Sequence, residues 1–364
     1  MSRQFVFYAP NVHTGGGFVL LRALLDAWPQ SMPLTVFLDA RARETLQAPM
    51  GAKTCWVRPT VAARLTAEFA LRRAADARGT VLCFHDLPPL LPSLAKVMVF
   101  QQNKNLLWHK SLPAFGFRTR VRLTFERAIS RMFQHHVTQY IVQTPSMQRA
   151  LLQWYGEGLK CGSPDVRLLP FVDNLRGVPR ISSTKMEWDF IYVADGEAHK
   201  NHLMLLAAWH LLARDGLHPS LALTLTQRDT LLKQAVEAQA GQAGLRIKDL
   251  GQLPHARVLS LYSTAGALIF PSTSESFGLP LFEASRIGLP ILAPELDYVR
   301  DVCTPAQTFD PASPVSIARA VKRFLQRPEP ALKLLTPQEF WQELLRPPPG
   351  GPDESTDGAG PDGH

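Results

Sequence analysis

Short, continuously apolar runs alternate with amphipathic stretches along the first half of the chain. Runs of this kind are typical of strands that are buried on both faces of a parallel sheet. They predict strands at residues 5–9, 34–38, 81–84, 97–100 and 140–143. Apolar residues at helical spacing predict helices between them, at residues 17–28, 61–79 and 145–156. Pro145 suits the first turn of the last helix, and Gly79 and Gly156 suit the ends of the last two.

A polar stretch without periodicity, residues 173–187, interrupts this alternation and predicts an interdomain linker. A second series then predicts strands within 189–194, 221–226, 245–251, 266–272 and 290–294, and helices near 202–214, 229–239, 255–264 and 280–287. Two such arrays predict an α/β protein with two Rossmann-like, doubly wound domains that face a cleft. We place the domains at 1–175 and 176–345, followed by a disordered Pro/Gly/Asp-rich tail at 346–364.

Composition narrows the class of protein. The chain has 364 residues, of which 46% are hydrophobic, and it contains no apolar run long enough to span a bilayer. Its start, MSRQFVFYAP, has no secretory h-region. The four cysteines lie far apart without a CxxC pair, which favours a reducing cytosol and argues against a structural zinc site. We therefore expect a cytoplasmic protein.

Positive charge is concentrated in the first half, where residues 1–175 hold 21 Lys/Arg against 10 Asp/Glu. Five arginines lie within the amphipathic stretch Arg118–Arg131. A basic amphipathic helix can lie on anionic lipid headgroups, although it can also pack its apolar face on its own domain. No nucleic-acid-binding motif accompanies these arginines, so we expect no nucleic-acid partner.

Two features of the first half are candidate ligand contacts. Gly15, Gly16 and Gly17 lie between the first predicted strand and helix, where glycine lets backbone amides approach an anion. The pattern is not GxGxxG, which disfavours a nicotinamide cofactor, and a tight turn is the alternative. His85 directly follows a predicted strand, at the carboxyl end where open α/β sheets bind ligands. A purely structural histidine is the alternative there.

A polar segment follows the first strand of the second half. Asp195, Glu197, His199 and His202 resemble a set of metal ligands, but Lys200 among them would repel a cation. We expect no metal here. Lys200 better suits the role of a point charge for phosphate at a helix N-terminus.

Glu275 and Glu283 enclose an almost wholly apolar stretch, ESFGLPLFE. A predicted strand ends before Glu275, and Pro280 suits the first turn of a helix. The backbone amides of residues 277–279 would then lie at the helix N-terminus, ready for a phosphate. The alternative for Glu283 is an i,i+3 surface pair with Arg286.

These residues carry a family resemblance. The segment FPSTSESFGLPLFEASRIGLPILA resembles the E-x7-E signature of the retaining nucleotide-sugar glycosyltransferases of the GT-B fold, specifically glycosyltransferase family 4. IVQTPSMQRALL, VRLLPFVDN and LGQLPHARVLSLYSTAGALIFPS match weaker family patterns in the expected order. The resemblance covers most of residues 5–325.

The resemblance implies a role for each candidate. Glu275 and His85 would contact the donor sugar, and Glu283 the ribose hydroxyls of the nucleotide. The donor diphosphate would be held by Lys200 and by backbone at Gly16, Gly17, Phe277, Gly278 and Leu279. One position departs from the family, which usually has an arginine where this chain has Asp195. Either a neighbour such as His199 supplies that charge, or amides hold more of the diphosphate.

The implied activity is metal-independent and cofactor-free transfer of a sugar from a nucleotide-diphosphate sugar to a glycan or lipid-linked acceptor. The family retains configuration by front-face attack, and we expect a role in bacterial surface polysaccharide synthesis (lipopolysaccharide, capsule or exopolysaccharide). The enzyme would act in the cytoplasm, with possible peripheral contact to the inner face of an anionic membrane. Three alternatives stay open: a sugar-nucleotide epimerase, a phosphorylase, or a non-catalytic GT-B subunit that binds the nucleotide sugar.

Overall fold

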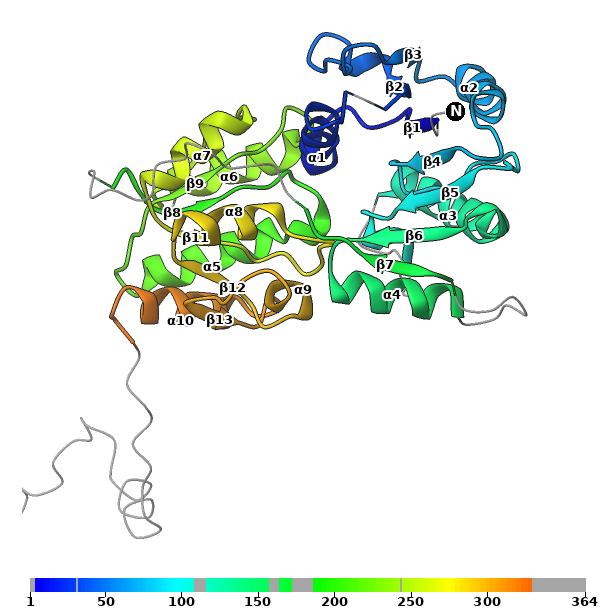
Figure 1. Ribbon diagram of the computed structural model, residues 1–364. Helices are drawn as coiled ribbons and strands as arrows, with labels where there is room; N and C mark the ends of the chain where they lie inside the picture. Colours follow the sequence, from blue (N-terminus) through cyan, green and yellow to red (C-terminus); the bar gives the residue numbers. More distant parts are fainter. Residues whose placement is uncertain are drawn as a thin grey trace, which may run out of the picture.

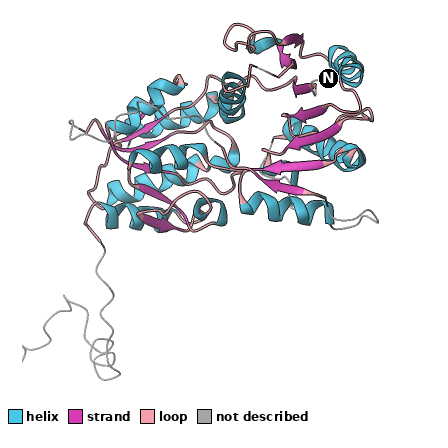
Figure 2. Cartoon of the chain, viewed as in Figure 1, coloured by secondary structure: helices cyan, strands magenta, loops and turns pink. Residues whose placement is uncertain are grey.

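Two parallel sheets, each covered by helices on both faces, make up the described part of the chain (Figures 1 and 2). The structure, a computed structural model, describes residues 4–30, 32–107, 116–156, 164–171, 186–242 and 244–328. The predicted tail at 346–364 and most of the predicted linker at 173–187 lie outside these residues, as does the domain boundary at 175/176. No helix in the described ranges is long and apolar enough to cross a bilayer.

The first sheet has the strand order β3-β2-β1-β4-β5-β6-β7. Its strands are β1 (Phe5–Ala9), β2 (Leu34–Asp39), β3 (Lys53–Val57), β4 (Thr80–Cys83), β5 (Lys96–Phe100), β6 (Gln139–Val142) and β7 (Val166–Leu168). The helices are α1 (Gly15–Asp26), α2 (Val61–Ala74), α3 (Phe117–Met132) and α4 (Pro145–Gly156), with 3-10 turns η1 (Ala40–Ala42), η2 (Lys104–Leu107) and η3 (Gln134–His136). β3 and β7 were not predicted, and both carry exposed side chains that break the apolar pattern.

The second sheet repeats this order as β10-β9-β8-β11-β12-β13. Its strands are β8 (Trp188–Tyr192), β9 (Leu221–Leu223), β10 (Ile247–Asp249), β11 (Ala265–Ile269), β12 (Ile291–Pro294) and β13 (Gln307–Phe309). Its helices are η4 (Ala198–Lys200), α5 (His202–Arg214), α6 (Thr230–Gln242), α7 (His255–Ser263), α8 (Leu279–Ile287), α9 (Asp297–Arg300) and α10 (Pro314–Phe324). The prediction of two Rossmann-like, doubly wound units is therefore confirmed.

The apolar runs form strands because both faces of each sheet are buried. In β1, Val6 and Tyr8 belong to one hydrophobic cluster, whereas Phe7 and Ala9 belong to another. Successive side chains of a strand point to opposite faces, so each face of the first sheet has its own core. This packing fixes the strand ends, and with them the loops that follow.

Each sheet reverses its order at one point, between β1 and β4 in the first and between β8 and β11 in the second. Open α/β sheets bind ligands at the carboxyl ends of the strands beside such a reversal. In this chain the glycine loop follows β1 and His85 follows β4, while Lys200 follows β8 and Glu275 follows β11. All four candidate segments thus lie at the positions where this topology places a ligand.

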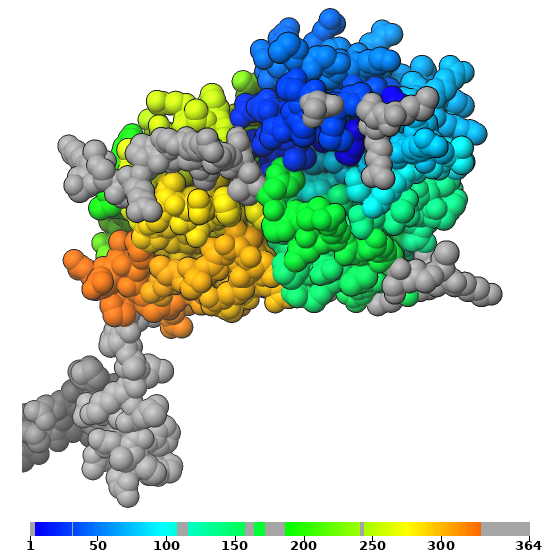
Figure 3. Space-filling model, viewed as in Figure 1, coloured from blue at the N-terminus to red at the C-terminus, as the bar shows by residue number. Residues whose placement is uncertain are grey.

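The two units touch directly, and Figure 3 shows their surfaces meeting along a seam. Thr144 Oγ1 donates to the carbonyl oxygen of Ser276 at 3.0 Å, and the Ser146 amide donates to Asp301 Oδ2 at 2.8 Å. These contacts join the start of α4 to the segment before α8 and to the end of α9. They hold the first domain against the loop that carries Glu275.

Candidate active site

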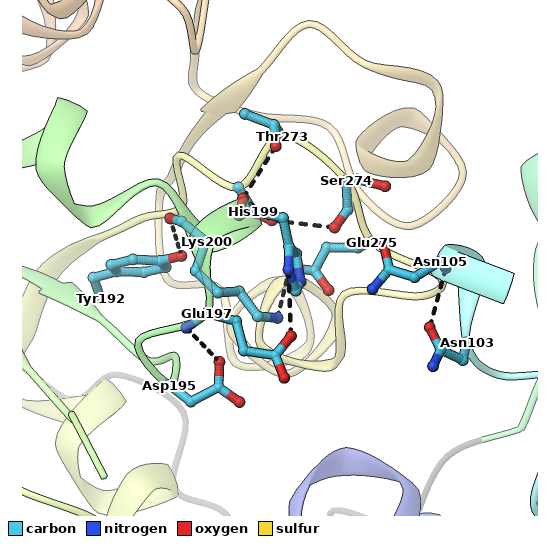
Figure 4. A network of polar contacts seen from close by, with 11 residues as sticks. Asn103, Asn105, Tyr192, Asp195, Glu197, His199, Lys200, Thr273, Ser274 and Glu275 are labelled. Atoms are coloured by element: carbon cyan, nitrogen blue, oxygen red, sulfur yellow. Dashed lines mark hydrogen bonds and ion pairs between the residues drawn. The ribbon is translucent and has the colours of Figure 1, made fainter. Parts of the chain in front are cut away.

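The structure brings Lys200 and Glu275 together in the second domain (Figure 4). Lys200 Nζ lies 2.7 Å from Glu275 Oε1, and both side chains are largely buried. The loops that carry them are tied to each other, because the carbonyl oxygen of His199 accepts hydrogen bonds from Thr273 N at 2.8 Å and from Ser272 Oγ at 3.1 Å. The pair is therefore held by backbone as well as by charge.

Two further bonds fix the backbone around Lys200. Tyr192 Oη donates to the Lys200 carbonyl oxygen at 2.7 Å. Asn201 follows in the left-handed region at φ 64°, and its side-chain amide donates to the carbonyl oxygens of Pro271 and Pro311. Asparagine tolerates this conformation better than most residues. Asn201 in this strained conformation joins η4 to α5 and sets the direction in which Lys200 approaches Glu275.

Electrostatics keep Lys200 protonated. Burial acts to lower the pKa of Lys200, but the carboxylates of Glu275 and Asp195 outweigh it and raise that pKa above the usual value. The ammonium is thus a permanent cation at physiological pH. It is the type of group that stabilises negative charge on a leaving phosphate.

Residues 195–200 are unusual for a phosphate site because two acids, Asp195 and Glu197, lie near Lys200. Asp195 is exposed, and its Oδ1 accepts a bond from the Glu197 amide at 3.4 Å. Partial burial and Asp195 raise the pKa of Glu197, while Lys200 and the Arg122 guanidinium of α3 act in the opposite direction. Among the described residues, no group of three or more His, Cys, Asp and Glu could hold a metal ion.

The N-termini of two helices, one from each domain, meet beside this pair. Gly278 caps α8 in the left-handed region at φ 76°, and Gly15 begins α1 with the same φ. A Cβ placed on Gly16 would have Leu279 Cδ2 of α8 as its nearest neighbour, at 4.0 Å. The predicted glycine loop is thus the first turn of α1 and faces residues 277–279. Both helix ends offer free amides and a positive dipole to an anion between them.

Glu283 is buried one turn into α8, and both of its oxygens have partners. His255 Nε2 lies 2.6 Å from Oε1, and Tyr262 Oη donates to Oε2 at 3.1 Å. The alternative of a surface pair with Arg286 is therefore wrong, because the carboxylate points into the domain towards α7. The proposed ribose contact stays a prediction, and it would have to share these oxygens.

His85 lies apart from the Lys200–Glu275 pair, in the first domain. Its ring packs edge-on against Tyr8 at 5.0 Å between ring centroids. Burial, assisted by the positive charge of Arg64, lowers the pKa of His85 to about 3, so the imidazole is neutral. No hydrogen bond or ion pair joins it to Lys200 or Glu275, all of which are described. A neutral imidazole can exchange hydrogen bonds with a sugar hydroxyl but supplies no charge.

Sequence reasoning missed the contribution of η2 from the first domain. Figure 4 shows Asn103 and Asn105 on one side of Glu275, and the Asn105 amide donates to Asn103 Oδ1 at 3.0 Å. Burial lowers the pKa of Lys104, and the nearby carboxylates partly offset this lowering; they belong to Asp297, Asp301 and Glu275. The segment that contains η2, QQNKNLL at residues 101–107, directly follows β5 at the carboxyl end of the strand. This position is the signal that could have identified η2.

Comparisons with known proteins indicate the family that the second domain resembles. Residues 178–335 match the family described as glycosyl transferases group 1. The match covers less than half of the chain and falls on the second domain. The chain is 31% identical over 140 residues to the serotype-specific mannosyltransferase WbdA of Escherichia coli, a match that covers 37% of this chain and 17% of that protein. It is 30% identical over 150 residues to the glycogen synthase of Mycobacterium tuberculosis, which covers 39% of this chain and 35% of that protein.

Solved structures resemble the whole two-domain arrangement. The sucrose-phosphate synthase of Thermosynechococcus elongatus superposes with a TM-score of 0.65 at 15% identity, covering 89% of this chain and 90% of the other. HepE of Anabaena, solved in complex with UDP-glucose, gives 0.62 at 14% identity with the same coverage. The fold is therefore GT-B, as predicted. The chain spans about a third or less of the length of the curated relatives above.

Proposed function

We propose that this protein is a retaining glycosyltransferase of family 4 that uses a nucleotide-diphosphate sugar. The observation that carries the proposal is the meeting of the α1 and α8 N-termini beside the Lys200–Glu275 pair. That arrangement offers one ammonium and two sets of free amides to a diphosphate, with a carboxylate next to it for sugar hydroxyls.

In the proposed reaction, an acceptor hydroxyl attacks the anomeric carbon of the donor from the side of the leaving group. The bond from that carbon to the diphosphate oxygen breaks, and the departing phosphate takes the acceptor's proton. Lys200 and the α8 amides stabilise the negative charge that develops on the leaving diphosphate. Glu275 orients the donor sugar through its hydroxyls, Glu283 holds the ribose, and His85 faces the donor sugar from the first domain. None of these roles requires a metal or cofactor.

The proposed setting is bacterial surface polysaccharide synthesis on the cytoplasmic side of the membrane, with a glycan or lipid-linked acceptor. The names of the relatives support it, since they include a serotype-specific mannosyltransferase and an O-antigen chain mannosyltransferase, both of Escherichia coli.

The arginine-rich helix α3 supports contact with an anionic membrane. Its apolar residues Phe117, Val121 and Phe125 recur every four positions and are 74%, 54% and 67% exposed. The alternative that this apolar face packs on its own domain is therefore wrong for these three residues. α2 adds a second exposed stripe, Val61, Leu65 and Phe69. Figure 1 shows α2 and α3 at the same end of the first domain. Exposed apolar residues flanked by arginine suit the headgroup region of a bilayer.

Binding and turnover of the donor test the proposed activity. We expect one or more of UDP-, GDP- and ADP-sugars to raise the melting temperature, because a ligand that binds only the folded chain stabilises it. The same nucleotide sugar should release its nucleoside diphosphate slowly without an acceptor and faster with one. A chain that binds none of these donors would contradict the proposal.

A non-catalytic subunit is the second candidate, and Asp195 favours it because a carboxylate stands where the family has a cation. Donor binding without any release of nucleoside diphosphate, across a panel of glycan acceptors, would support this candidate. Formation of an isomerised nucleotide sugar would instead indicate an epimerase, and sugar 1-phosphate formed from glycan and phosphate would indicate a phosphorylase.

A further inference from the structure

A polar cavity of about 100 Å³ lies at the carboxyl end of the first sheet. Its lining includes Asn11, His85, Asp86, Asn103, Arg122 and Glu126. About 10–15 Å³ of such volume is enough to hold one water, so the cavity holds several waters or part of a polar ligand. This volume is large enough for several hydroxyl groups of a bound sugar.

Asp86 is held in an unusual conformation at this cavity. Its φ of 70° lies in the left-handed region, which a non-glycine residue rarely adopts without support. The support comes from Oδ1, which accepts bonds from the backbone amides of Gln102 and Asn103. Oδ2 accepts no hydrogen bond from the described residues. One oxygen of Asp86 therefore fixes the segment that leads into η2, and the other stays available to a ligand.

Arg122 and Glu126 form the α3 side of the cavity. They lie 4.0 Å apart as an i,i+4 pair, with the Arg122 side chain 61% and the Glu126 side chain 23% exposed. A pair of this length whose arginine is largely exposed is weak, so Glu126 can exchange its partner for a ligand at little cost. Asn11 adds a third acceptor, because its Oδ1 is buried without a hydrogen-bond partner among the described residues.

The charges in the cavity select the class of ligand. Two carboxylates and one amide oxygen require hydrogen-bond donors, and His85 is neutral. A phosphate or carboxylate would face both acids, and an ammonium would face the Arg122 guanidinium. Sugar hydroxyls donate hydrogen bonds without carrying a charge, and they fit all three acceptors.

We infer that this cavity binds the hydroxylated edge of a neutral sugar at the reacting end of the acceptor, with Asp86 and Glu126 as its hydrogen-bond acceptors. The inference rests on the proposed function and adds the acceptor class to it. Its place in the fold agrees, since Asn103 lines the cavity while Asn105, two residues on, lies beside Glu275 of the second domain (Figure 4). The cavity thus adjoins the predicted donor site.

Binding of simple glycosides to three variants tests the inference. The variants are Asp86→Asn and Glu126→Gln, which keep size but remove a carboxylate oxygen, and Glu44→Gln as a control at an exposed acid of the same domain. The probes are the methyl α-pyranosides of mannose, glucose and galactose, with mannose 6-phosphate as the anionic probe. Each is titrated by saturation-transfer NMR in the presence of the nucleoside diphosphate that the parent binds.

We expect at least one neutral glycoside to bind the parent and the control equally, and to bind both other variants at least tenfold more weakly. Mannose 6-phosphate should bind more weakly than methyl mannoside. Unchanged glycoside affinity in both variants, tighter binding of the phosphate, or no neutral glycoside bound by the parent would each overturn the inference. Melting temperatures with the nucleoside diphosphate show whether the variants fold and keep the donor site. Failure of the parent to bind any nucleoside diphosphate would refute the proposed function instead.

Discussion

Lys200 Nζ and Glu275 Oε1 lie 2.7 Å apart although 75 residues separate them, and each residue follows a strand beside the sheet reversal of the second domain. The Lys200 ammonium contacts the Glu275 carboxylate and lies beside the N-termini of α1 and α8. A ligand diphosphate would therefore compete with Glu275 for Lys200, which frees the carboxylate to accept sugar hydroxyls.

The first prediction concerns that cation. Lys200→Met keeps the length of the side chain but removes the charge, and we expect donor turnover to fall about 10²- to 10³-fold, as for other groups that stabilise a leaving charge. Lys322→Met is the control, because Lys322 also forms a carboxylate pair, with Asp215 at 2.6 Å, between α10 and the end of α5. Initial rates of nucleoside diphosphate release measure the effect. A Lys200→Met rate within threefold of the parent would refute the assigned role.

The second prediction concerns the seam between α1 and α8. The nearest neighbour of a Cβ on Gly16 lies 4.0 Å away, so Gly16→Ala fits without strain. Gly16→Leu would fill the space in front of Leu279 and exclude a diphosphate. We expect Gly16→Leu to weaken nucleoside diphosphate binding at least tenfold, about 1.4 kcal/mol, while Gly16→Ala stays close to the parent. Calorimetric titration distinguishes the two, and equal affinities would show that the diphosphate binds elsewhere.

The third prediction separates the two roles open to Glu283. If the carboxylate holds ribose, the parent prefers a ribonucleoside diphosphate over its 2′,3′-dideoxy analogue, and Glu283→Gln loses most of that preference. If it serves only His255 and Tyr262, the variant keeps the preference and loses stability instead, by about 1–3 kcal/mol for a buried bond. Paired titrations with the two nucleotides, together with thermal melts, decide between these outcomes.

The fourth prediction is a pH dependence at Asp86. Burial raises the pKa of Asp86 to about 6, against the opposing effect of the Gln102 and Asn103 amides. The unfolded chain releases this proton near pH 4, so the folded chain binds more protons between about pH 4 and 6. The free energy of unfolding therefore falls as pH rises through this window. Asp86→Asn removes the effect, and its stability relative to the parent should grow from pH 4 to 7, by up to about 3 kcal/mol.

Denaturant melts of the parent and Asp86→Asn at both pH values measure this difference. His85 titrates in the opposite sense, since its low pKa removes stability as pH falls below about 6.5, but both proteins share that contribution. Asparagine also suits the left-handed φ, which adds an offset independent of pH. A difference in stability that is the same at pH 4 and pH 7 would refute the prediction.

The fifth prediction tests the membrane face. We expect the parent to co-sediment with phosphatidylglycerol vesicles at low salt and to be released at high salt, because screening weakens the arginine contribution. Phe117→Ser combined with Phe125→Ser should reduce binding at both salt concentrations. Leu231→Ser, at an 82% exposed residue of the second domain, is the control. Absence of binding at low salt would remove membrane contact from the proposal.

Most of the strands that the sequence predicted have both faces buried, as β1 and β2 do. β3 was not predicted because three of its five residues are exposed, so its apolar residues form neither a continuous nor an alternating pattern. The candidate site was reached differently. Glu275 and Lys200 were identified by their positions after predicted strands, and the family resemblance then implied their roles. Their contact could not be predicted from spacing because it depends on how two loops meet.

Periodicity also has a limit that α3 illustrates. The spacing of Phe117, Val121 and Phe125 identifies an apolar face correctly, but it cannot say what covers that face. The same holds for Glu283, whose partner His255 lies on another helix, 28 residues earlier in the chain. Partners of this kind are decided by tertiary packing.

The shared seam has a thermodynamic consequence for the whole molecule. If each domain supplies one helix end to the diphosphate, the ligand acts as a reversible cross-link between halves that are otherwise joined by contacts such as Thr144–Ser276. Donor affinity then includes the free energy of holding the domains together. Thr144→Val leaves every diphosphate contact in place. It removes the bond to Ser276 between the domains, together with the bond from the Met147 amide at the start of α4, and would thereby weaken the donor complex.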